Sequence, residues 1–276
     1  MDKPNHLVIV PCHAIWKGRQ KLDQNEWYLA EFQLEGNDHL CFIDHIQQAV
    51  HQIKRDTRAH LIISGGETKK VAGPIAEATS YYQLLQEIVN NDQQILAKVD
   101  IEVFARDSFE NVLFSLCRFY ELFQIYPDKI TIIGFEFKRN RFVHLHLMKA
   151  LGVAQNDIEF IGNEPKPQGT AKKIASYLQD LEASEQKHAW QLFVKDWYGI
   201  GQTLRDKKRK RNPFNRRHNY ISTNPLIAEF LKEISDDYNS TKTNEEISSL
   251  LKEAPWGIKP ATQTFQPPTL NPYIEE

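Results

Sequence analysis

Short, continuous runs of valine, isoleucine and leucine constrain the fold of this chain more than any other feature. Four stand out: HLVIVP at residues 6–11, AHLIIS at 59–64, DIEVFA at 100–105 and KITIIG at 129–134. A strand with one face in water alternates apolar and polar residues, whereas a strand covered on both faces has an unbroken apolar sequence. The runs therefore predict a parallel sheet enclosed between layers of helices.

Apolar residues at helical spacing lie between these runs. The period of three or four residues is clearest in the stretches 43–53, 75–88 and 112–123. Farther along, we expect a helix from residue 141 to about 151, a fifth strand at 157–162 and another helix at 169–181. Strands that alternate with helices predict an α/β fold, here a Rossmann-like three-layer α/β/α arrangement with a mostly parallel sheet.

The C-terminal part of the chain departs from this alternation. From Trp190 onward the apolar period weakens, residues 205–218 are strongly basic, and the end of the chain from Trp256 is rich in proline. We expect residues 1–200 to form the α/β domain. Residues 201–276 are expected to form a basic and proline-rich extension that packs in part on the domain, with the proline-rich tail extended or disordered.

Composition narrows the class of protein. The 276 residues are 41% hydrophobic and 25% charged, with a formal net charge of -2, as in ordinary soluble globular proteins. The cysteines Cys12, Cys41 and Cys117 have no C-x-x-C spacing and lie in apolar contexts, which predicts small buried side chains in a reducing compartment. No stretch has the length of a membrane span or a signal peptide. We therefore predict a cytoplasmic protein without a membrane association.

Ionisable and hydrogen-bonding residues follow every strand. In open α/β sheets the ligand site lies beyond the carboxyl ends of the strands, so these residues are expected at one edge. The candidates are His13 after the first strand, Gly65, Gly66, Lys69, Lys70 and Glu77 after the second, Asp107, Ser108, Glu110 and Asn111 after the third, and Lys138, Arg139 and Arg141 after the fourth. An inert scaffold has little reason to gather such groups, which predicts a binding or catalytic site.

The glycines and cations indicate an anionic ligand. Without Cβ atoms, Gly65 and Gly66 allow backbone N–H groups to approach a ligand, and Pro74 suits the first turn of a helix whose N-terminus favours an anion. We expect the charge to be neutralised by Lys138, Arg139 or Arg141, and acid or base function to come from Glu77, Glu110 or His13.

Several of these signals also have a structural explanation. Two glycines after a strand often form only a tight turn, and adjacent lysines are often a solvated loop. Asp107 or Ser108 followed by Glu110 fits the cap and first turn of a helix. The cations at 138–141 oppose the dipole of a helix that starts there, which favours a functional role for them.

Familiar local signatures of cofactor and metal sites do not occur in the sequence. It has no G-x-G-x-x-G, no G-x-x-x-x-G-K-[ST], no G-x-S-x-G and no H-E-x-x-H. His144 and His146 are two residues apart on an expected helix and so point to different faces. We therefore predict no metal site and assign no cofactor.

Four segments together resemble the DUF-218 family, the SanA/ElyC/YdcF-like proteins. HLVIVPCHA, LIISGGETKKVAGPIAEA, ARDSFENV and ITIIGFEFKRNRF are similar to the family in order and spacing over residues 6–162. The resemblance implies a Rossmann-like fold and a polar, anion-friendly cleft at the strand ends, with an activity that is poorly defined across the family. It points to Ser64, Gly65, Gly66, Glu77, Ser108, Glu110, Asn111 and Arg141 as site residues.

The chain departs from the bacterial pattern of this family at two places. PCHAIWKG stands where the first loop is usually rich in glycine, and GFEFKRNR stands where a threonine–histidine pair is usual. Either His13 and Lys138 replace the missing groups, or the chemistry has diverged. The HAIW loop and the basic segment resemble the soluble, fungal-type branch, so envelope roles do not transfer.

The basic segment has two interpretations. Residues 205–217 contain eight lysines and arginines and one acid, Asp206, which is typical of a nuclear localisation signal or a solvated surface. The interrupting Asn212 and Phe214 favour a covering segment, with Phe214 as a buried anchor and with Arg211, Asn212, Arg216 or His218 close to the strand-end cations.

We therefore predict an enzyme that acts on a phosphorylated or nucleotide-like small molecule, by hydrolysis or group transfer, in a cationic cleft. The alternative is a non-catalytic module that binds a nucleotide or S-adenosylmethionine. Binding of nucleic acid through residues 205–217 is a third interpretation, and the mixed composition of that segment disfavours it.

Overall fold

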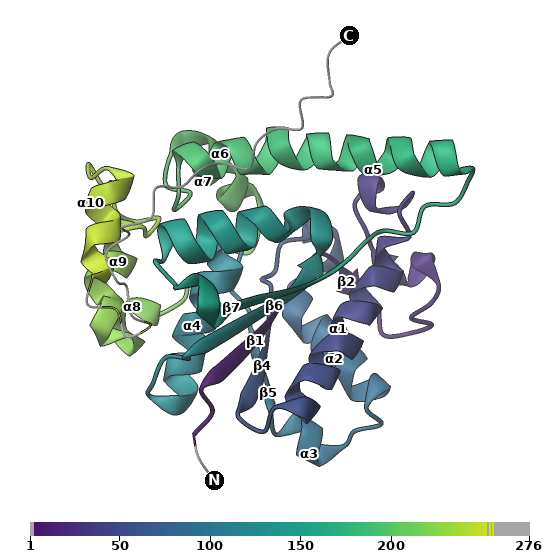
Figure 1. The fold of residues 1–276 in the computed structure, drawn as a ribbon, viewed down its shortest axis with the longest axis horizontal. Helices are drawn as coiled ribbons and strands as arrows, with labels where there is room; N and C mark the ends of the chain where they lie inside the picture. Colours follow the sequence, from purple (N-terminus) through teal and green to yellow (C-terminus); the bar gives the residue numbers. More distant parts are fainter. Residues whose placement is uncertain (1–2, 253, 255, 257–276) are drawn as a thin grey trace.

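The computed structural model describes residues 3–252, 254 and 256. Its centre is a sheet of five parallel strands in the order β5-β4-β1-β6-β7, which confirms the predicted α/β class (Figure 1). The strands are β1 (His6–Pro11), β4 (Ala59–Ser64), β5 (Val99–Glu102), β6 (Lys129–Phe135) and β7 (Ile158–Asn163). Each coincides with a predicted run, although β5 ends three residues early.

The early end of β5 has a local cause. The carboxylate of Glu102 accepts hydrogen bonds from the backbone amides of Phe104 (2.6 Å) and Ala105 (3.2 Å). A side chain that bonds its own following backbone replaces the sheet pairing those amides would otherwise make. The chain therefore leaves the sheet at Glu102, before the end of the apolar run.

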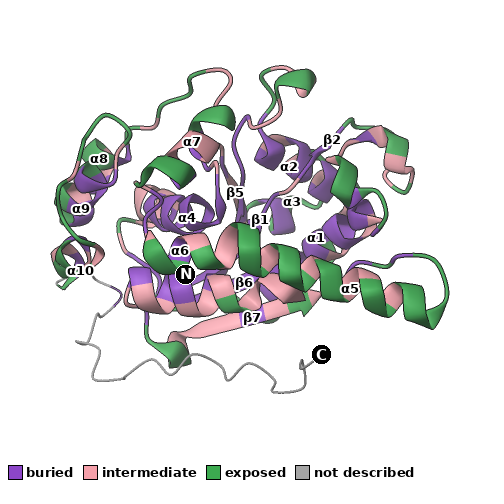
Figure 2. Ribbon diagram, turned by 90° about the horizontal axis from the view of Figure 1, so that it is seen from above, coloured by how far each residue is buried: buried purple, intermediate pink, exposed green. Residues whose placement is uncertain are grey.

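Helices cover both faces of the sheet, as the three-layer prediction requires (Figures 1 and 2). Against one face lie α1 (Asp38–Arg55), α2 (Glu77–Ile88) and α3 (Gln93–Leu96), and against the other lie α4 (Ser108–Phe123) and the π-helix η5 (Arg141–Ala150). Side chains of β1 alternate between the two cores, since Leu7 and Ile9 face α4 whereas Val8 and Val10 face α1. All three cysteines are buried and free, as predicted.

The strand order places the topological switch point of the sheet at the carboxyl ends of β1 and β6. From β1 the chain proceeds outward through β4 to β5, and it then crosses to the opposite side of β1 for β6 and β7. The connections after β1 and β6 leave in opposite directions, and such a switch point is the usual ligand position in open α/β sheets. His13 and Lys138 follow these two strands.

Short elements complete the edge of the sheet. A hairpin of β2 (Ile15–Trp16) and β3 (Trp27–Tyr28) follows β1. Single 3-10 turns are η1 (Gln24–Glu26), η2 (Glu31–Gln33), η3 (Lys70–Ala72), η4 (Glu136–Lys138) and η6 (Gln155–Asp157).

The weaker apolar period after Trp190 predicts less regular structure there, and this is wrong for the described residues. The chain continues through α5 (Ala171–Glu185), η7 (Gln186–Trp190), α6 (Gln191–Lys195), α7 (Gln202–Lys210), α8 (Tyr220–Thr223), η8 (Pro225–Ile227), α9 (Ala228–Glu233), α10 (Asn244–Ser248) and η9 (Ser249–Leu251). Most of these helices span only one or two turns, too short for an apolar period to repeat.

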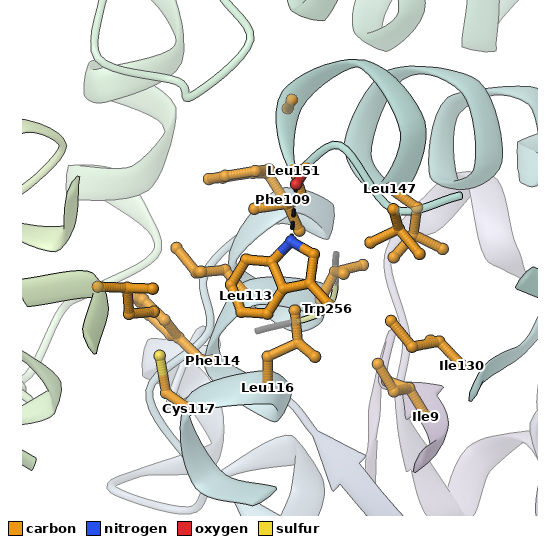
Figure 3. Packing of buried hydrophobic residues seen from close by; sticks show 14 of the residues in the cluster. Ile9, Phe109, Leu113, Phe114, Leu116, Cys117, Ile130, Leu147, Leu151 and Trp256 are labelled. Atoms are coloured by element: carbon orange, nitrogen blue, oxygen red, sulfur yellow. Dashed lines mark hydrogen bonds between the residues drawn. The ribbon is translucent and has the colours of Figure 1, made fainter. Parts of the chain in front are cut away.

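The later helices belong to the same core as α4. Phe230 and Leu251 are fully buried in that core, and the Trp256 indole N–H donates to the carbonyl of Leu151 at 2.8 Å (Figure 3). Trp256, the first residue of the tail predicted to be extended or disordered, is therefore held in the core, and the rest of that tail, residues 257–276, lies outside the described residues. Within the described part of the chain, no helix combines the length and apolarity needed to cross a bilayer.

Candidate functional site

The two glycines after β4 serve close packing of the backbone. The amide of Gly65 donates to the carbonyl of Glu102 (3.0 Å), and that of Gly66 donates to the carbonyl of Ala105 (2.8 Å). The carbonyl of Gly66 in turn accepts from the amide of Glu77, at the start of α2. The prediction that these N–H groups hold an anion is therefore wrong, because they are already bonded to the neighbouring chain.

Gly65→Ala should lower the free energy of unfolding by about 1–3 kcal/mol, since its Cβ would lie 2.7 Å from Cys12 Cβ and 3.0 Å from Glu77 Cβ. Gly134→Ala is the matched control, because its nearest new contact is an ordinary one, 3.8 Å to Phe160. Chemical denaturation of both variants measures the difference. Equal stabilities would show that the loop has room for a side chain.

The side chains of Ser64 and Asn111 support this loop through hydrogen bonds. The Ser64 hydroxyl lies 2.7 Å from Glu102 Oε2 and 2.9 Å from Asn111 Oδ1. Ser64 has no exposed surface, so a direct ligand contact, as expected for it, is contradicted. Burial raises the pKa of Glu102 to about 7. Glu102 was not among the predicted residues, although it connects the ends of β4 and β5.

Glu110 is a structural anion and does not fit the predicted acid or base role. Its carboxylate accepts from Arg106 Nη2 (2.6 Å) and Nε (2.9 Å), and Lys208 Nζ lies 3.4 Å away. Burial opposes ionisation, but the charges of Lys208 and Arg106 outweigh it and hold the pKa of Glu110 at about 2. A carboxylate this acidic does not exchange protons at neutral pH. Its neighbour Asp107 caps α4 by accepting from the Glu110 amide (2.9 Å).

Arg139 also lies outside the site. Its guanidinium makes a two-point ion pair with Glu136 and donates to the carbonyl of Phe160 at 3.2 Å, over whose ring it lies. These contacts join η4 to the edge strand β7. The predicted ligand contact of Arg139 is therefore replaced by a structural role.

Lys138 is the residue that most clearly departs from a structural role. Its ammonium lies 4.9 Å from the ring centroid of Phe135 and 5.3 Å from that of Phe137, and no hydrogen bond or ion pair joins it to another described residue. Burial and the nearby charge of Arg141 lower the pKa of Lys138 to about 8. A half-buried cation that forms no ion pair with a described residue is costly, and it predicts an anionic ligand.

Arg141 and Ser108 lie together, as predicted. Arg141 Nη1 donates to the Ser108 hydroxyl at 2.9 Å, and that hydroxyl lies 2.8 Å from Nε2 of His146. Burial keeps the pKa of His146 well below its usual range, so the ring is neutral. Its Nε2 can then accept a hydrogen bond from the Ser108 hydroxyl. The other side of Arg141 pairs with Glu185 at 2.7 Å, a residue of α5, which lies across the carboxyl edge of the sheet (Figure 1).

His13 and Glu77 carry the proton-transfer potential of the site. The His13 ring stacks on Phe135, and its Nε2 is buried without a hydrogen-bond partner. Burial and the charge of Lys138 keep the pKa of His13 well below its usual range, so the ring is neutral. Burial raises the pKa of Glu77, against the opposing charge of Lys69, and the hydroxyl of Thr68 donates to its carboxylate.

The charges of four cations act on one or both of these side chains, and we refer to them as the cationic centre: Lys69, Lys138, Arg141 and Arg211. The charges of Lys138, Arg141 and Lys69 all act on His13, and those of Lys69, Arg211 and Lys138 act on Glu77. Nearby Asp38 is buried, and its pKa is raised to about 7 by that burial. Glu185 is the acid that forms an ion pair with the cationic centre.

The basic segment crosses the strand ends, as the covering interpretation predicts. Arg211 Nη1 donates to the carbonyl of Arg106 at 3.1 Å, and Arg216 Nη1 lies 3.0 Å from the Glu67 carboxylate, which directly follows Gly66. Phe214 is only half-buried, so the predicted anchor is wrong. Tyr220 is buried instead, and its ring stacks on that of His218 with centroids 4.8 Å apart.

Comparison with known proteins identifies a relative whose name describes no activity. No protein-family model and no solved structure matches the chain. The uncharacterized protein YOR238W of Saccharomyces cerevisiae is 38% identical over 262 residues, which cover 78% of this chain and 86% of the yeast protein. The chain belongs to the family of this yeast protein.

The sequence alone did not identify several site residues of this member of the YOR238W family. Lys69 was recognised as a strand-end cation but was not distinguished from Lys70. Glu102 lies in β5, and Asp38 lies at the start of α1. Acids at such positions usually have a structural explanation. Glu185 comes from a helix beyond the sheet, and no local signal connects it to Arg141. Among the described residues, no group of three or more histidines, cysteines and acids is arranged to hold a metal ion.

Proposed function

We propose that this protein binds a phosphorylated or nucleotide-like small molecule at the cationic centre and acts on it by hydrolysis or group transfer. The observation that carries the proposal is the unpaired ammonium of Lys138, whose burial and proximity to Arg141 lower its pKa to about 8. An anion between these cations would relieve their repulsion and restore the charge balance of the site.

The composition of the cationic centre suits phosphate better than a carboxylate. Arg141 and Arg211 offer planar groups that grip phosphate oxygens at two points, and Lys69 and Lys138 add point charges. The Ser108 hydroxyl, held by Arg141 at 2.9 Å, is a further donor or acceptor at the N-terminus of α4. Glu185 pairs with Arg141, and the charge of Asp107 also acts on Arg141, so the four positive charges still outnumber these two acids and favour an anionic ligand.

Glu77 is the better candidate for proton transfer, because its raised pKa lies closer to neutrality than that of an ordinary carboxyl. Neutral His13 can donate or accept a hydrogen bond through its unpartnered Nε2. In a transfer reaction these groups would move a proton to or from the attacked or leaving oxygen, and the cations would stabilise the charge that develops on phosphate. The resemblance to the DUF-218 family remains in agreement with such a site.

A binding module without turnover is the second candidate function. It is favoured because Glu110 stays ionised. This excludes one of the three residues that were expected to supply acid or base function. Binding of nucleic acid has less support, since much of the basic segment is already neutralised: Lys208 pairs with Glu110, Arg216 with Glu67 and Arg217 with Asp237.

Lys69→Met should weaken binding of inorganic pyrophosphate and AMP by about tenfold, the effect of removing one charge-assisted contact. Lys70→Met is the matched control, because Lys70 is exposed on the same loop. Thermal melting with increasing pyrophosphate, AMP and S-adenosylmethionine measures the stabilisation that each ligand produces by mass action. Equal responses of the two variants, or no response of the wild type to any phosphate compound, would contradict the proposal.

Turnover separates the two candidate functions. Incubation of the wild type with the ligands that stabilise it, followed by mass spectrometry, should reveal a product that Glu77→Gln fails to form although it still binds the ligand. Stabilisation without any product in the wild type would favour the binding module.

A further inference from the structure

Helix α5 lies across the carboxyl ends of the strands without fully burying any of its side chains (Figures 1 and 2). Its partly buried residues are spaced three or four apart, which places them on one face of the helix: Ile174, Tyr177, Leu178, Leu181 and Glu185. Among the helices and strands outside its continuation η7, α5 packs chiefly on η4, the turn that carries Lys138. The helix therefore covers part of the cationic centre.

The contacts that hold α5 in this position are weak. The ion pair of Lys173 with Glu35, at 3.6 Å, joins two exposed side chains, and such a pair contributes little to stability. By contrast, α1 and α4 each bury one face in an apolar core against the sheet. Elements with few buried apolar contacts open at a lower cost in free energy than the rest of a protein. Local opening of α5 should therefore be easier than unfolding of the domain.

Glu185 joins α5 to the cationic centre. Its Oε1 lies 2.7 Å from Arg141 Nε, and its Oε2 accepts a hydrogen bond from Arg141 Nη2 at 3.2 Å. The closer contact lacks hydrogen-bond geometry, because Nε and Oε1 are both buried without a hydrogen-bond partner in the described part of the chain. The carboxylate thus lies where a ligand oxyanion would bind a guanidinium at two points, but it pairs imperfectly.

Both ends of α5 have features that permit a change of direction. Directly after Glu185 the π-helix η7 begins, before α6 returns the chain to the core at Phe193. Helices commonly bend at π-helical segments. At the other end, α5 follows Gly169, whose φ of +142° lies in a region that favours glycine. The ion pair with Arg141 therefore holds α5 next to a position at which the helix can bend.

We propose that the Glu185 carboxylate occupies the position of the ligand's anionic group on Arg141, and that the ligand binds by displacing it. Displacement frees α5 from Arg141 and uncovers the strand ends. A phosphate offers Arg141 two oxygens, as the carboxylate does, and its further charge can interact with Lys138, which forms no ion pair with a described residue. This inference rests on the proposed function and adds how access to that site is regulated.

The sulfate affinity of Glu185→Gln tests the competition for Arg141. The variant keeps the shape of the side chain and removes the competing charge. In calorimetry the full chain should bind sulfate about tenfold more tightly than the wild type, the gain expected when a competing state populated about 90% of the time is removed. Glu182→Gln is the matched control, because Glu182 is exposed on the same helix, and it should bind sulfate as the wild type does. Weaker binding by Glu185→Gln would show that Glu185 positions Arg141 for the ligand, and would overturn the proposal.

Hydrogen exchange in the wild type is a second measurement, which does not depend on the folding of a variant. Saturating sulfate should make the backbone amides of α5 exchange about threefold faster or more, although a bound ligand ordinarily stabilises the native state. Amides of α4 are the internal control, since that helix lies in the core, and their exchange should not become faster. Unchanged or slower exchange in α5 would overturn the release of the helix.

The outcomes separate this inference from the proposed function. Equal sulfate affinities of the wild type, Glu185→Gln and Glu182→Gln would overturn the displacement of Glu185 and leave the cationic centre as an anion site. If neither the wild type nor Glu185→Gln binds sulfate or pyrophosphate, the proposed function fails, and this inference fails with it.

Discussion

Lys138→Met should make the ligand-free protein more stable by about 1–3 kcal/mol at pH 7 and should abolish sulfate binding. The half-buried ammonium has its pKa lowered to about 8 from a reference value of 10.5, so the folded state holds a charge that it disfavours relative to the unfolded chain. Replacement by an apolar side chain removes that cost. The same change removes a cation that forms no hydrogen bond or ion pair with the described residues and contacts only the rings of Phe135 and Phe137. Urea denaturation and sulfate titration measure the two effects.

The pH dependence of stability and of sulfate affinity follows from the lowered pKa of Lys138. Because the folded pKa lies below the unfolded one, the unfolded chain binds more protons between about pH 8 and 10.5, and the stability contributed by this residue rises across that window. Sulfate stays fully ionised there, so its affinity should fall as pH rises through 8 and Lys138 loses its charge. Lys138→Arg should keep sulfate affinity at pH 9.5, since arginine remains protonated.

Lys149→Met is the control for this prediction, because the Lys149 ammonium lies over the Trp197 ring and has no place in the cationic centre. It should leave both sulfate affinity and its pH dependence unchanged. Wild-type sulfate binding by Lys138→Met at pH 7, or a loss of stability comparable to that of a core deletion, would show that Lys138 supports the fold instead of a ligand.

Glu110→Ala should destabilise the protein by about 3–5 kcal/mol, the expected cost of leaving buried charges unpaired. The variant leaves Lys208, which is only 3% exposed, without its ion-pair partner. Arg106, which is largely buried, loses one of its two acids and keeps Asp236. Glu121→Ala removes an equally charged but half-exposed side chain from the same helix and should cost about 1 kcal/mol or less. Denaturant unfolding monitored by tryptophan fluorescence compares the two.

A double variant checks the cause of that loss. Glu110→Ala combined with Lys208→Met should be more stable than Glu110→Ala alone, because the second change removes the charge left without a partner. If Glu110→Ala instead retained wild-type stability and lost only catalytic turnover, Glu110 would be a proton-transfer group after all, and its structural assignment would be incorrect.

The strand-end rule located the site in outline. Residues that follow parallel strands reach the same edge because all carboxyl ends meet there, so His13, Glu77, Lys138 and Arg141 could be expected together without coordinates. The rule carries no information on side-chain partners. Arg139 and Arg141 are two residues apart and read alike in the sequence, yet one is held by Glu136 on its own turn and the other reaches Ser108.

The unbroken apolar runs by themselves determined the parallel sheet, its two helical layers and the edge at which polar groups gather, because burial on both faces leaves a direct mark on sequence. Only the tertiary structure decided which of those groups are free to act. Glu110 is neutralised by Lys208 from the basic segment, Arg141 is paired by Glu185 from α5, and Lys138 forms no ion pair with any acid among the described residues. Charge pairing joins segments that lie far apart in the sequence. Neither hydrophobic periodicity nor local motifs show which distant segments come together in the fold.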